Sequence, residues 1–195
     1  MVEIAEKMDA SVINARCNLF HPCHALATMM TVLDNSTNPS IVYIGKGNAQ
    51  CNSLIMAADR YEIPLTVSTP QNSKPFKEIN SGTIDEITFN EITALRPIIE
   101  TDSKTDKLSF LKTPSEAISH GKNQGDVFLY IGDLSGCENF LRSIPQIAPH
   151  NEVYNNTVLL EYTKHDHPSI FGERVDNQTY IQTALVIFLA DKMPK

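Results

Sequence analysis

The chain has 195 residues, of which 42% are hydrophobic and 20% charged, and these values predict a globular domain with a sizeable core. The net charge of -7 disfavours RNA as a partner, because broad binding to a phosphate backbone needs a positive surface. The N-terminus lacks the basic start and apolar run of a signal peptide, and no segment approaches the ~20 apolar residues of a membrane span. We therefore expect an intracellular, cytoplasmic protein without a membrane partner.

Residues 1–38 predict a helical segment. A first helix is expected from about Ser11. A stronger helix covers residues 22–33, because apolar side chains recur near one face and Pro22 suits a first helical turn.

Residues 39–195 predict strands and helices in alternation, which is typical of a mostly parallel sheet flanked by helices. The predicted strands cover residues 41–44, 64–67, 108–111, 127–131 and 157–162. The further predicted helices cover residues 49–61, 114–120 and 137–147. Residues 179–189 are expected to add one or two closing strands. The whole chain is thus predicted to form a single Rossmann-like α/β domain.

Two of the predicted strand ends have similar sequences. IVYIGKGNAQCNSL and FLYIGDLSGCENFL each contain a strand ending in Tyr-Ile-Gly, then a short turn, a Cys and a Leu. This similarity is expected where two strand-to-helix turns of one sheet both need glycine for a tight bend. A duplication within the chain is the alternative.

The turn after the first predicted strand is a candidate ligand site. Gly45 and Gly47 let the backbone bend sharply and approach a ligand, and the following helix offers N–H groups and a positive dipole end. Adenosine-containing ligands use this arrangement. A tight turn without a ligand is the alternative, since Ala49 stands where a third glycine would be.

Asp133 follows the fourth predicted strand, and the C-terminal ends of parallel strands line the ligand crevice. A carboxylate there can orient a substrate hydroxyl or a ligand amine, or it can cap the next helix. A second group of titratable side chains lies in LLEYTKHDHP, residues 159–168, and includes Lys164, His165 and His167. Such density at a strand end indicates either a site or a solvated loop.

Together these segments resemble S-adenosylmethionine-dependent methyltransferases, and more narrowly the viral cap ribose 2′-O-methyltransferases of nidoviruses and poxviruses. The similarity rests on QGDVFLYIGDLSG, on VLLEYTKHD and on the strand end from Tyr43 to Gly45. It implies S-adenosylmethionine as the cofactor, with methyl transfer to an RNA ribose hydroxyl, or a catalytically silent relative that binds an adenosine-type ligand. The residues expected to hold that ligand are Tyr43, Gly45, Gly47, Asn48 and Asp133.

The resemblance also implies a catalytic set of Lys-Asp-Lys-Glu, in which a lysine favours deprotonation of the ribose hydroxyl. Asp133 matches the aspartate, whereas Glu161 stands in place of a lysine and Lys164 follows three residues on. Lys7 is the candidate upstream lysine, and Glu173 is the candidate glutamate. The set is incomplete, and Asp133 and Lys164 are the predicted catalytic residues.

Two other classes of function fit parts of the sequence. Cys23 lies near the start of a predicted helix, where a thiol pKa is lowered, and with His165 or His167 it would form the dyad of a papain-like cysteine hydrolase. A buried apolar role is the alternative for Cys23. The second class is a non-enzymatic interaction protein on the same fold. No metal site is predicted, because the Cys/His cluster over residues 17–24 matches no common zinc spacing.

Overall fold

The computed structural model describes residues 6–70, 73, 75, 108–110, 114–133, 135, 157–161 and 171–192. These residues contain a five-stranded parallel sheet, and its strands are β1 (Pro39–Ile44), β2 (Leu65–Ser68), β3 (Leu108–Phe110), β4 (Asp126–Ile131) and β5 (Thr157–Glu161). The helices are α2 (Pro22–Asn35), α3 (Ala49–Arg60), α6 (Pro114–Lys122) and α8 (Phe171–Lys192). The predicted Rossmann-like α/β fold with a parallel sheet is confirmed.

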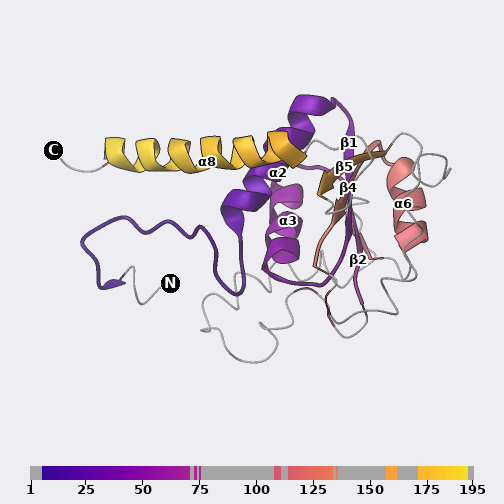
Figure 1. Cartoon of the computed structure of the whole chain (residues 1–195), viewed down its shortest axis with the longest axis horizontal. Helices are drawn as coiled ribbons and strands as arrows, with labels where there is room; N and C mark the ends of the chain where they lie inside the picture. Colours follow the sequence, from indigo (N-terminus) through magenta and orange to yellow (C-terminus); the bar gives the residue numbers. More distant parts are fainter. Residues whose placement is uncertain are drawn as a thin grey trace.

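Helices cover both faces of the sheet (Figure 1). The helices α2 and α3 lie on one face, α6 lies on the other, and α8 packs against α2. The strand order is β3-β2-β1-β4-β5, so the chain moves outward in one direction from β1 and in the opposite direction from β4. None of the described helices is both long enough and apolar enough to cross a membrane.

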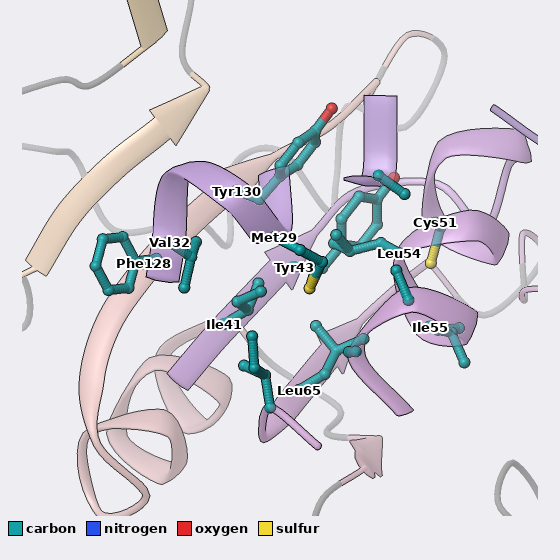
Figure 2. Close-up of a cluster of buried hydrophobic side chains, with 14 of the residues drawn as sticks. Met29, Val32, Ile41, Tyr43, Cys51, Leu54, Ile55, Leu65, Phe128 and Tyr130 are labelled. Carbon is teal, nitrogen blue, oxygen red and sulfur yellow. The ribbon is translucent and has the colours of Figure 1, made fainter. Parts of the chain in front are cut away.

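The hydrophobic core fills the space between the sheet and the pair α2 and α3 (Figure 2). Every second residue of the central strands points to this side, as the strand period requires. The side chains contributed by the strands and helices include Ile41, Tyr43, Leu65, Val67, Phe128, Tyr130, Met29, Val32, Leu54 and Ile55. Parallel pairing in register sets Tyr43 opposite Tyr130, and the two rings stack with their centroids 5.4 Å apart.

The other face of the sheet is approached closely by α6. A Cβ atom added at Gly121 of α6 would collide with Cγ2 of Val42 on β1. Glycine at this position therefore lets the helix lie directly against the central strand.

Two predicted elements are wrong. Residues 11–20 form no helix, because the Cys17 thiol accepts hydrogen bonds from the Asn14 side chain and the Phe20 N–H and holds a turn there. Residues 179–189 are not closing strands but part of α8, since a short apolar run fits a strand or a helix equally well. The predicted helix over residues 137–147 lies outside the described residues.

Candidate functional site

The reversal of strand order between β1 and β4 creates a topological switch point, where ligands bind in open α/β sheets. Gly45 follows β1 and Gly132 follows β4. A Cβ atom added at Gly45 would lie 3.0 Å from the Gly132 Cα, and one added at Gly132 would collide with the Tyr43 hydroxyl. The two similar Tyr-Ile-Gly segments are therefore neighbouring strand ends, and close packing around one tyrosine requires glycine in both.

The turn after β1 is closed by its own backbone. The N–H groups of Gly45, Lys46 and Gly47 donate to carbonyl oxygens of β2, of Asp133 and of residue 73, at distances of 2.8–3.1 Å. These N–H groups are satisfied within the protein and do not point at open solvent. The turn thus has a structural role, and the ligand role of Gly45 and Gly47 stays a prediction.

The N-terminus of α3 is capped by Asn48. Its side-chain Oδ1 accepts hydrogen bonds from the N–H groups of Gln50 at 3.0 Å and Cys51 at 3.2 Å. A phosphate or carboxylate bound at this helix end would have to displace the Asn48 side chain. Tyr43 is buried, and its hydroxyl donates to the Lys46 carbonyl oxygen at 2.6 Å. The predicted ligand residues are thus gathered at one edge of the sheet, engaged with each other.

A solvent-accessible pair of opposite charges lies just beyond the C-terminal ends of β1 and β4. Lys46 Nζ lies 3.4 Å from Asp133 Oδ2 and donates to Ser135 Oγ at 2.9 Å, and the side chains of Lys46 and Asp133 are 27% and 48% exposed. The Ser135 backbone N–H donates to Asp133 Oδ1 at 2.8 Å. This bond, followed by the Ser135 hydroxyl and the Lys46 charge, lowers the pKa of Asp133. Asp133 is therefore a carboxylate at neutral pH.

Asp133 was predicted as a site residue from the sequence, whereas Lys46 was not. The signal was available, because each residue directly follows a Tyr-Ile-Gly segment. Parallel strands paired in register bring equivalent positions together, so the two charged side chains had to become neighbours.

A second polar cluster lies between α2, β4 and α8. The buried His24 places Nε2 2.6 Å from the Tyr130 hydroxyl and Nδ1 3.0 Å from Arg174 Nη1. A guanidinium only donates, so Nδ1 accepts and the proton sits on Nε2, which donates to Tyr130. Burial, followed by the Arg174 charge, lowers the pKa of His24 to about 3. His24 is neutral at physiological pH and connects α2 with β4 and α8, a role that was not predicted from the sequence.

The residues of the hydrolase prediction do not form a nucleophilic site. Cys23 is 1% exposed on α2, and burial raises the pKa of its thiol, whereas a nucleophile needs a lowered one. Lys164, His165 and His167 lie outside the described residues. Within the described part of the chain, no three His, Cys, Asp or Glu side chains converge closely enough to hold a metal ion.

Comparison with known proteins finds ornithine carbamoyltransferases, while no protein-family model matches the chain. The Bacillus anthracis ornithine carbamoyltransferase is 36% identical over 80 residues, which cover 40% of this chain and 25% of the relative. The Archaeoglobus fulgidus enzyme is 26% identical over 168 residues, which cover 84% of this chain and 47% of the relative. The crystal structure of the anabolic ornithine carbamoyltransferase from Campylobacter jejuni superposes with a TM-score of 0.66 at 19% identity, over 98% of this chain and 66% of that chain.

The chain thus spans a quarter to about half the length of these sequence relatives. The findings overturn both enzyme assignments made from sequence: the viral methyltransferase with its S-adenosylmethionine cofactor is wrong, and so is the cysteine hydrolase. A Gly-containing turn and an acidic residue at a strand end occur in many Rossmann-like sheets, so they indicated the fold and not the activity. Asp133 stays a predicted ligand residue, and the chain is similar in sequence to parts of ornithine carbamoyltransferases.

Proposed function

We propose that this chain is a carbamoyltransferase-type domain that binds an amino-acid acceptor, of the ornithine class, at the crevice between β1 and β4. The sequence relatives are named ornithine carbamoyltransferases, and their similarity to this chain supports carbamoyl transfer as the class of reaction. The solved relatives support the fold that positions the crevice. Because the chain spans 66% of the Campylobacter jejuni chain, the proposal for it is confined to acceptor binding.

The observation that carries this proposal is the exposed charge pair of Lys46 and Asp133. A free amino acid is a zwitterion, with an ammonium and a carboxylate a few ångströms apart. Asp133 matches an ammonium group, and Lys46 matches a carboxylate. An exposed ion pair contributes only about 0–1 kcal/mol, so a ligand can separate the two side chains at little cost.

The N-terminus of α3 is already capped by Asn48, which also favours an amine-bearing ligand over a nucleotide phosphate. Asn48 already satisfies the N–H groups that would bind a phosphate. The negative charge of Asp133 repels a phosphate and attracts an ammonium group. We also place this activity in the cytoplasm, since Cys17, Cys23 and Cys51 are unpaired thiols, as expected in a reducing compartment.

Isothermal titration calorimetry with L-ornithine tests the proposal, with S-adenosylmethionine as the ligand expected not to bind. Loss of a charge-assisted hydrogen bond worth ~1.5–3 kcal/mol predicts that Asp133→Asn weakens ornithine binding by about tenfold or more. Asn keeps an acceptor for the Ser135 N–H, so the turn is preserved. The matched control is Asp59→Asn, an exposed carboxylate at the far end of α3, which is expected to leave the affinity unchanged.

Two results would contradict the proposal. One is the absence of ornithine binding to the unaltered chain at concentrations on the order of 10 mM, which would exclude even a weak site. The other is equal affinity of the unaltered chain and Asp133→Asn, because the ammonium would then bind elsewhere.

A further inference from the structure

The backbone of Lys46 is held on both sides of its side chain. Its N–H donates to the Asp133 carbonyl oxygen at 2.9 Å, and its carbonyl oxygen accepts from the Tyr43 hydroxyl at 2.6 Å and from the Asn48 N–H at 2.9 Å. The first bond joins the turn to the end of β4, and the bond from Asn48 closes the turn on itself. The Tyr43 hydroxyl is therefore the side-chain group that fixes the Lys46 carbonyl from the core of the protein.

The Tyr43 hydroxyl is itself confined. Tyr43 is buried, and its ring stacks on that of Tyr130 at an interplanar angle of 25°. A Cβ atom added at Gly45 would lie 3.0 Å from this hydroxyl, and one added at Gly132 would collide with it. The hydroxyl thus lies beside both strand-end glycines, and its single proton is donated to the Lys46 carbonyl oxygen.

Tyr130 makes a different contact, although it has the equivalent position on β4. The two tyrosines are paired in register, and both belong to the buried core (Figure 2). The Tyr130 hydroxyl lies 2.6 Å from His24 Nε2 on α2. One hydroxyl of the stacked pair therefore bonds to the turn of Lys46 and the other bonds to a helix, so each can be removed without the other.

A fixed backbone matters at Lys46 because its side chain is long and flexible. The four-carbon stem can place Nζ in many positions, and the contacts with Asp133 and Ser135 select one region among them. A backbone that moved at the base of the stem would spread Nζ further. A ligand binds more tightly to groups that are already in place, since less freedom is then lost on binding.

We propose that Tyr43 is a positioning residue of the acceptor site: its hydroxyl fixes the Lys46 carbonyl, and Lys46 Nζ is thereby placed to meet the carboxylate of the ligand. The Tyr43 side chain does not touch the ligand, because it is buried beneath the turn. The fixed carbonyl lets the Lys46 side chain swing away from Asp133 while the turn stays in place. The inference deepens the proposed function and rests on it, because it names the residue that orients one half of the charge pair.

Isothermal titration calorimetry of Tyr43→Phe with L-ornithine tests the inference. Phenylalanine keeps the ring that stacks on Tyr130, and the Lys46 carbonyl oxygen keeps its bond from the Asn48 N–H. We expect binding about three- to tenfold weaker than in the unaltered chain, as the loss of one hydrogen bond implies. The matched control is Tyr130→Phe, which removes the other hydroxyl of the stack and is expected to leave the ornithine affinity unchanged.

A double-mutant cycle with Lys46→Met separates positioning of Lys46 from general support of the site. Binding is followed here by NMR chemical shifts, so that weak affinities stay measurable. In the Lys46→Met background, Tyr43→Phe is expected to cause no further loss of ornithine affinity, because the side chain that it positions is gone. A further loss of about threefold or more would overturn the inference, since Tyr43 would then support the site as a whole.

The outcomes distinguish the two proposals. Equal ornithine affinity of the unaltered chain and Tyr43→Phe, or an equal loss in Tyr130→Phe, would refute only the positioning role of Tyr43. Absence of ornithine binding to the unaltered chain would refute the acceptor site, and the positioning role with it.

Discussion

Acidification should destabilise this fold at a pH where its carboxylates are still ionised, because of His24. Burial and the neighbouring Arg174 charge lower the pKa of His24 from 6.5 to about 3 in the folded chain. The unfolded chain therefore takes up the proton first, and stability falls as the pH drops from 6.5 towards 3. At about 1.4 kcal/mol per pKa unit, the free energy of unfolding should decrease by about 2 kcal/mol between about pH 7.5 and pH 5.

Urea denaturation at a series of pH values measures this slope. The control is His24→Gln, which removes the titrating group and should abolish most of the slope, whatever its effect on absolute stability. The comparison of slopes separates titration from the loss of the contacts with Tyr130 and Arg174. A flat pH dependence of the unaltered chain, or an unchanged slope in His24→Gln, would refute the buried neutral histidine.

Three further changes test the packing, each by urea denaturation. Gly121→Ala should lower the free energy of unfolding by about 1–3 kcal/mol, because the added methyl group collides with a β1 side chain. The methyl group added in the control Gly172→Ala meets nothing within 4 Å and should not destabilise the fold. Equal effects of the two changes would contradict the close approach of α6 to β1. Tyr130→Phe should lower the free energy of unfolding by about 1–3 kcal/mol, because it removes the hydroxyl group that accepts a hydrogen bond from the buried His24. The control Tyr180→Phe changes an exposed hydroxyl group and should leave the stability unchanged. Asn48→Ala should lower the free energy of unfolding by about 1 kcal/mol through loss of the α3 cap. An unchanged free energy of unfolding would mean that water replaces the cap.

The parallel sheet could be predicted because its strands are short apolar runs bounded by glycine turns. Residues 41–44 and 127–131 were expected as strands, and the observed β1 and β4 include both runs. Burial on both faces makes such strands apolar throughout, which is a strong signal. Asp133 was expected just past the fourth strand, and it lies two residues after β4, while its role in ligand binding stays a prediction.

Local patterns failed where the deciding contacts come from distant parts of the chain. Residues 179–189 contain β-branched and apolar side chains at strand length, but they continue a helix that begins at Phe171 and is held by α2. The buried Arg174 could not be recognised, since its partner His24 is 150 residues away. The activity was misassigned for a related reason: turn motifs are set by sheet geometry, which many unrelated enzymes share.

The most direct test of the account is a crystal structure of the chain soaked with L-ornithine. The account predicts the ligand at the C-terminal ends of β1 and β4, with its ammonium group within hydrogen-bond distance of Asp133 and the contact between Asp133 and Lys46 opened. Ornithine bound away from this crevice, or an unaltered ion pair with no ligand under conditions that saturate the calorimetric signal, would contradict it.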